Sequence, residues 1–71
     1  MKVIFDPGTD TLSIILRDEK ISESDEVREG VIIDYSKDGR IVSIEIMDAS
    51  EQVMEPQSIF YGVSTKQRDF T

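Results

Sequence analysis

The stretch Gly30-Val-Ile-Ile-Asp-Tyr-Ser-Lys-Asp-Gly-Arg-Ile-Val-Ser-Ile-Glu-Ile46 decides the fold expected for this chain. Apolar and polar residues alternate on both sides of Asp38-Gly39, a dipeptide that favours a tight hairpin turn because Gly, and to a lesser degree Asp, tolerates positive φ. A two-residue loop pairs Lys37 with Arg40. The further pairs are Tyr35–Val42, Ile33–Ile44 and Val31–Ile46 on one face, and Asp34–Ser43 and Ile32–Glu45 on the other. A slip of one residue would mix the two faces, so the pattern predicts this register.

The N-terminal part of the chain predicts a second hairpin. Residues 2–5 and residues 11–17 alternate in polarity, and Asp6-Pro-Gly-Thr-Asp10 between them has the composition of a turn. Pairing Phe5 with Leu12 and Val3 with Ile14 places four apolar side chains on one face. The two hairpins together predict a small antiparallel sheet.

Residues 18–29 carry six acidic and two basic side chains, which is a net −4 of the whole chain's −7. Within this segment, residues 21–28 fit an edge strand, a loop or a helix capped by Ser22. We favour the edge strand, because apolar residues do not recur at helical spacing there and because charge protects a strand edge from unwanted pairing.

The C-terminal third predicts less regular structure. Ser50 can cap a short helical turn over residues 50–54 that ends before Pro56. Residues 57–63 fit a last strand, in which Ile59, Phe60 and Tyr61 either close the core, the more usual role, or form an exposed interface patch. We therefore expect one mainly β domain over residues 1–63 and a flexible polar tail over residues 64–71.

Composition excludes several function classes. The chain has 71 residues, no Cys and no His, so disulfides, thiolate chemistry, imidazole metal sites and Ser-His or Cys-His pairs are absent. No basic patch offsets the net charge of −7, which disfavours nucleic acid and anionic membranes as partners. No apolar stretch is long enough for a signal peptide or a membrane span, so the expected location is the cytoplasm. A sheet of this size needs a cover for its apolar face, and we expect the C-terminal segment, curling of the sheet and a second copy to supply it.

Three blocks of the sequence resemble the YuzE-like family of small prokaryotic domains of unknown function. These blocks are Phe5-Asp-Pro with Asp10 and Leu12, then Gly30-Val-Ile-Ile-Asp-Tyr with Asp38-Gly-Arg-Ile-Val, and Ile44-Glu-Ile-Met-Asp-Ala-Ser50. The family usually has Tyr in place of Phe5 and often an aromatic residue in place of Ser13. The resemblance implies a compact β-rich domain and no established activity. Such domains are sometimes encoded beside small toxin-like proteins, which suggests an antitoxin-like or partner-binding role.

Four carboxylates are the candidates for chemistry. Asp6 and Asp10 flank one turn, where they either bind a divalent cation or, more often in such turns, satisfy backbone N–H groups. Asp34 and Glu45 share one face of the central hairpin, where they either raise each other's pKa for proton transfer or line a solvated surface.

The favoured function is interaction without bond chemistry and without a cofactor. The partner is a second copy or a small basic protein that docks on an acidic strip, and the strip consists of Glu23, Asp25, Glu26 and Glu29. The alternative is a metal-dependent hydrolase or small-ligand binder that uses the clustered carboxylates. The absence of a nucleophile–base pair argues against an enzyme.

Overall fold

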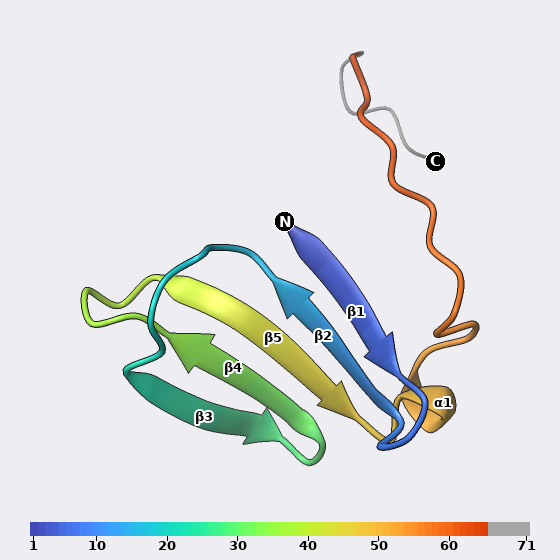
Figure 1. Ribbon diagram of the computed structural model, residues 1–71, viewed down its shortest axis with the longest axis horizontal. Coiled ribbons are helices and arrows are strands. Elements are labelled where there is room, and N and C mark those ends of the chain that lie inside the picture. The colour runs from blue at the N-terminus through green and yellow to red at the C-terminus, as the bar shows by residue number, and fades with distance from the viewer. Residues whose placement is uncertain (66–71) are drawn as a thin grey trace.

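The computed structural model describes residues 1–65, which form one open antiparallel sheet followed by a short helix (Figure 1). The elements are β1 (Lys2–Asp6), β2 (Thr11–Ile15), β3 (Glu23–Arg28), β4 (Val31–Tyr35), β5 (Ile41–Met47) and α1 (Ala49–Gln52). The strand order across the sheet is β1-β2-β5-β4-β3. The predicted mainly β fold with two hairpins and one helical turn is therefore confirmed, and the two hairpins join where β2 pairs with β5.

The register of the central hairpin is confirmed over most of its length. Val31 pairs with Ile46, Ile33 with Ile44, and Asp34 with Ser43. The N-terminal hairpin is also confirmed, because Val3 lies opposite Ile14 and Phe5 opposite Leu12. Cross-strand partners occupy the same face of an antiparallel sheet, so the predicted separation of apolar and mixed faces holds in both hairpins.

The predicted two-residue loop is wrong. Ser36 donates its N–H to the carbonyl of Arg40 at 2.8 Å, and the loop contains three residues, 37–39. Gly39 alone in this loop has positive φ (87°), which is the pattern of a type I turn followed by a left-handed residue. Tyr35 consequently pairs with Ile41 instead of Val42, and a bulge at this point restores the predicted register from Asp34 onward.

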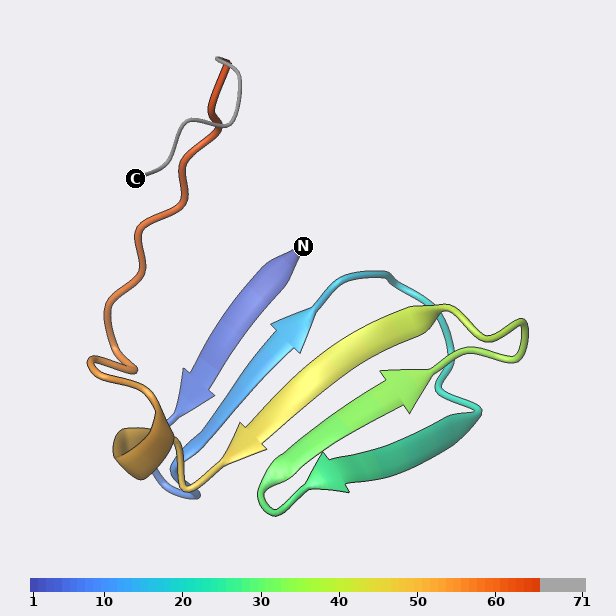
Figure 2. The same cartoon turned by 180° about the vertical axis from the view of Figure 1, so that it is seen from behind.

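Two faces of the sheet differ sharply in chemistry. One face, here called the apolar face, consists of Val3, Phe5, Leu12, Ile14, Val31, Ile33, Ile44 and Ile46. The opposite face, here called the polar face, mixes Ile4, Ile15 and Ile32 with Ser13, Ser24, Glu26, Asp34, Ser43 and Glu45. Figures 1 and 2 show the sheet from its two sides and show it as a single layer. Leu12, Val42 and Ala49 are the buried apolar residues of the described chain, so the core is very small.

The ambiguous segment is an edge strand, as favoured. Strand β3 pairs with β4 alone, and every one of its residues is exposed. The long connection from β2 brings the chain across the sheet, where Ser22 donates its N–H to the carbonyl of Tyr35 at 2.7 Å. A bulge between Glu26 and Arg28 then leads into the turn before β4.

Two expectations for the C-terminal third are wrong, and for Ile59, Phe60 and Tyr61 the less favoured of the two alternatives, exposure, holds. Helix α1 begins at Ala49 with Asp48 as N-cap in the left-handed region, so Ser50 lies inside the helix and does not cap it. Residues 57–63 form no strand. Ile59, Phe60 and Tyr61 are exposed and close no core, because the chain after α1 runs beside and beyond β1 instead of over the sheet (Figure 1). Most of the predicted tail, residues 66–71, lies outside the described residues.

Candidate functional site

Asp34 is the centre of a polar cluster on the polar face of the sheet. It lies in β4 between β3 and β5, and only 1% of its surface is exposed. The alternation of β4 points Asp34 away from the apolar face, and the strand register places Ser24 of β3 on one side of it and Ser43 of β5 on the other. A carboxylate this deeply buried requires hydrogen-bond partners, because an unpaired buried charge is strongly unfavourable.

The cluster satisfies both oxygens of Asp34. The Ser24 hydroxyl donates to Oδ1 at 2.5 Å and the Ser43 hydroxyl donates to Oδ2 at 2.6 Å. Both distances are in the short range of hydrogen bonds to an ionised carboxylate. Three strands are thereby joined by side chains as well as by backbone pairing. No buried side-chain oxygen or nitrogen in the described chain lacks a partner.

Glu45 completes the cluster as a hydrogen-bonding neighbour of Asp34. Burial alone would raise the pKa of Asp34, but hydrogen bonds with Glu45, Ser24 and Ser43 outweigh it and hold that pKa below its ordinary value. The pKa of Glu45 moves the other way, because its hydrogen bond to Asp34, its partial burial and the charge of Asp34 all raise it. The pair therefore keeps Asp34 ionised while Glu45 retains its proton to higher pH than a free glutamate.

This pair could transfer a proton but offers little else to a substrate. Both oxygens of Asp34 are already occupied by serine hydroxyls. The chain has no His or Cys to act as a nucleophile or as a partner base. The cluster is therefore better suited to holding β3, β4 and β5 together than to catalysis. Asp34 and Glu45 were predicted to share a face, and the structure brings them together.

Asp6 and Asp10 both satisfy backbone groups. Asp6 accepts the N–H of Gly8 at 2.9 Å within its own turn. Asp10 instead holds the start of α1: its backbone carbonyl accepts the N–H of Ala49 at 2.8 Å, and its carboxylate accepts the N–H and the hydroxyl of Ser50 at 3.0 and 2.7 Å. No group of three potential metal-ligating carboxylates, Cys or His is found in residues 1–65.

The four carboxylates of the predicted acidic strip do not share one surface. Glu23 and Asp25 lie on the side of the apolar face, opposite Tyr35 and Ile33, whereas Glu26 lies on the side of the polar face. Glu26 also accepts the N–H of Gly30 at 3.1 Å, which ties it to the turn after β3. All four acids, including Glu29, are exposed and lie along the free edge of the sheet.

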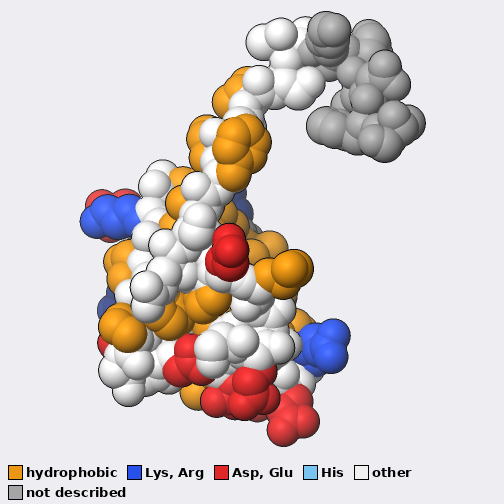
Figure 3. All heavy atoms as spheres, turned by 90° about the vertical axis from the view of Figure 1, so that its right-hand side faces the viewer, with side chains coloured by type: hydrophobic (Ala, Val, Ile, Leu, Met, Phe, Trp, Pro, Cys, Tyr) orange, Lys and Arg blue, Asp and Glu red, His pale blue; other side chains and the backbone are white. Residues whose placement is uncertain are grey.

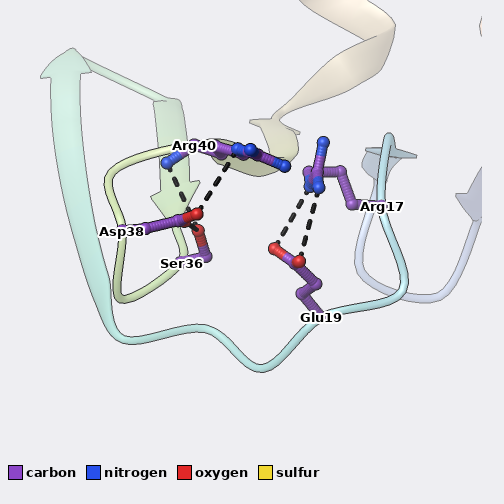
Figure 4. A network of polar contacts seen from close by, with 5 residues as sticks. All are labelled: Arg17, Glu19, Ser36, Asp38 and Arg40. Atoms are coloured by element: carbon purple, nitrogen blue, oxygen red, sulfur yellow. Dashed lines mark hydrogen bonds and ion pairs between the residues drawn. The ribbon is translucent and has the colours of Figure 1, made fainter.

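A second polar network surrounds the loop that joins β4 to β5. Figure 4 shows Asp38 between the Ser36 hydroxyl and the Arg40 guanidinium, and Arg17 forms a two-point ion pair with Glu19, at 3.1 and 3.3 Å. An open hollow of about 580 Å³ lies beside it, lined by residues 19–20 and 36–38. The hollow includes neither Asp34 nor Glu45, so it does not provide the acid pair with a substrate pocket.

The apolar face has little cover from the described residues: Val3 is exposed, Leu12 is buried, and its other six side chains are half-buried. Within residues 1–65 no helix and no second sheet covers it; residues 56–59 approach it only beside Val3, Phe5 and Leu12, around a hollow of about 170 Å³.

Comparison with known families gives one match. A model described as "Protein of unknown function (DUF2283)" matches residues 2–50, which is more than half of the chain. The chain belongs to this family. The DUF2283 match covers all five strands and ends within α1. No curated protein and no solved structure matches the chain significantly. In residues 1–65 no helix is long and apolar enough to cross a membrane.

Sequence reasoning missed two partners in these sites. Ser24 was not recognised as a partner of Asp34, because the strand that contains it was itself ambiguous. The pairing of Ser24 with Asp34 would have identified it once β3 was known. Ser50 was not recognised as a partner of Asp10, because 40 residues separate them and no local pattern connects them.

Proposed function

We propose that this DUF2283 domain is an interaction module that self-associates through the apolar face of its sheet. The observation that carries the proposal is the set of eight apolar side chains that four adjacent strands present on one face, without a covering layer in residues 1–65. A sheet buries its apolar face against another layer, and a 71-residue chain has little material to supply that layer by itself.

The absence of charge on the apolar face supports a second copy as the covering layer. Two copies of the apolar face would form a two-layer sandwich with a neutral centre. The acids of β3 would lie at its rim, where salt screens the repulsion between two chains of net charge −7.

A matched pair of variants in β4 tests this proposal. Ile33 lies on the apolar face and Ile32 on the polar face, and both side chains are partly exposed. Threonine keeps the strand propensity of isoleucine, so Ile33→Thr should weaken the dimer without unfolding the sheet, whereas Ile32→Thr should leave the dimer intact. Light scattering with size exclusion measures the mass. A monomeric natural chain, or equal effects of the two variants, would refute the proposal.

A second candidate function is recognition of a small basic protein, which is the antitoxin-like role implied by the resemblance to YuzE-like domains. It is supported by the exposure of Glu23, Asp25 and Glu26 on the edge strand β3 and of Glu29 in the turn that follows it. If this role is correct, binding weakens steeply with salt and on charge reversal at Glu23 and Asp25, whereas charge reversal at Glu51 of α1 has little effect. The proposed location is the cytoplasm, since a chain without Cys gains nothing from an oxidising compartment.

A further inference from the structure

The residues after α1 form an apolar arm, defined here as residues 57–63, that leaves its own sheet. Ile59 and Tyr61 are about two-thirds exposed, Val63 is 75% exposed and Phe60 is 92% exposed. Figure 1 shows the arm running past β1 and beyond the N-terminus, and Figure 3 shows its orange side chains projecting from the body of the molecule. Large apolar side chains exposed together in this way indicate a docking segment.

The arm matches the apolar face in its lack of charge. Between Glu55 and Lys66 the chain carries no charged residue, so the arm can enter an apolar interface without burying a charge. Four of the five residues from 59 to 63 are apolar, with Gly62 as the exception, and none of them belongs to a helix or strand of its own sheet.

We propose that the arm of each copy docks on the apolar sheet face of a second copy, in a reciprocal exchange; this inference rests on the proposed self-association. The chain already contains both complementary surfaces, so no other partner is needed, and a reciprocal exchange closes as a two-fold dimer. Residues 56–59 lie beside Val3, Phe5 and Leu12 at the margin of their own apolar face. The arm therefore begins at the margin of the proposed interface. From there it runs away from its own strands.

The arms would supply a substantial part of the interface. An aromatic side chain buries about 150–250 Å², so Phe60 and Tyr61 of two arms would contribute roughly 600–1,000 Å². A standard interface buries about 1,600 Å² in total. The arms alone are too small to hold a dimer, so the facing sheets would supply the rest of the interface.

Variants of the full-length chain test the role of the arm. Phe60→Ser and Tyr61→Ser, separately and combined, should raise the dimer dissociation constant by about tenfold or more for each aromatic residue removed. Met54→Ser is the matched control, because Met54 is 91% exposed and precedes the arm. Analytical ultracentrifugation measures the constants. A dimer that is unaffected by the double variant, or equally weakened by Met54→Ser, would overturn the inference.

Cross-linking identifies the surface on which the arm docks. A photoreactive phenylalanine at position 60, in a mixture of ¹⁵N-labelled and unlabelled chains, should give mixed-isotope products joined to residues of the apolar face such as Ile33 and Ile44. Products within single chains only, or joined elsewhere, would show that the inference is wrong. If the natural chain is monomeric, both proposals fail. If the dimer persists but the arm does not contact the second copy, only the arm exchange fails.

Discussion

Removing the hydroxyl of Ser43 should destabilise the domain far more than removing that of another serine on the same face. Ser43 donates to Asp34 Oδ2 at 2.6 Å, and Asp34 is 1% exposed, so water cannot replace the lost hydrogen bond without rearrangement of the sheet. Hydrogen bonds to charged groups are worth about 1.5–3 kcal/mol. We expect Ser43→Ala to lower the free energy of unfolding by that amount.

The size of the chain makes this loss easy to measure. For domains of 60–100 residues, a loss of 1 kcal/mol lowers the melting temperature by about 4–8 °C, so Ser43→Ala should lower Tm by about 6 °C or more. Thermal and urea denaturation, followed by circular dichroism, measure the change. The protein concentration must be constant, because association contributes to apparent stability.

Ser13→Ala is the matched control. Ser13 lies on the same face in β2, is half-buried where Ser43 is buried, and makes no side-chain hydrogen bond within the described residues. A double-mutant cycle adds a second check, because the effect of Ser43→Ala should shrink when Asp34 is already replaced by Asn. Equal losses for Ser43→Ala and Ser13→Ala, or an undiminished effect in the Asp34→Asn background, would refute the account of the cluster.

Two further predictions concern the acid pair and the hairpin loop. The raised pKa of Glu45 means that its stabilising contribution is fully present below its ordinary value of 4.5 and is lost as pH rises through the folded-state pKa. The free energy of unfolding of Glu45→Gln, relative to that of the natural chain, should therefore rise between pH 4 and pH 7 by at most about 1.4 kcal/mol per pH unit. Urea titrations measure it, and a difference that does not vary with pH contradicts this prediction. Gly39→Ala should cost about 1–2 kcal/mol, because Gly39 has φ 87° and its neighbourhood is open, so only backbone strain opposes the new methyl group. Lys37→Ala in the same loop, with ordinary φ, should change little by the same denaturation assay, and a tolerated Gly39→Ala would show that the loop relaxes.

The hairpins were predictable because their information is local. The alternation around Asp38-Gly39 and around residues 6–10 determines which side chains share a face, and a change of register would bury charge and expose the apolar side chains. The loop length was not predictable in the same way. Only one residue with positive φ was formed where two were expected, and the bulge beside Tyr35 compensated for the extra loop residue. The longer loop and the bulge offset each other, so the predicted assignment of side chains to the two faces was still correct.

The candidate site was predictable in part. Asp34, Ser43 and Glu45 follow from the register of one hairpin, so the sequence was sufficient to bring them together. The near-complete burial of Asp34 depends also on Ser24, which arrives on a strand from outside the hairpin. Likewise, Asp10 was expected to satisfy its own turn, but it holds α1, because β2 pairs with β5 and brings the end of β5 beside the Asp10 turn.

The sequence alone determined an alternating two-hairpin sheet with acidic residues along one edge, because strand pairing within hairpins depends on neighbours in the chain. Only the tertiary structure decided the order of the strands, the burial of Asp34, and whether residues 57–63 cover the sheet or run past it. The last of these could not be inferred from local pattern, because the apolar alternation of the arm is the same whether it covers its own sheet or projects from it. What distinguishes the two is the path of the chain after α1, and that path leaves the apolar face open.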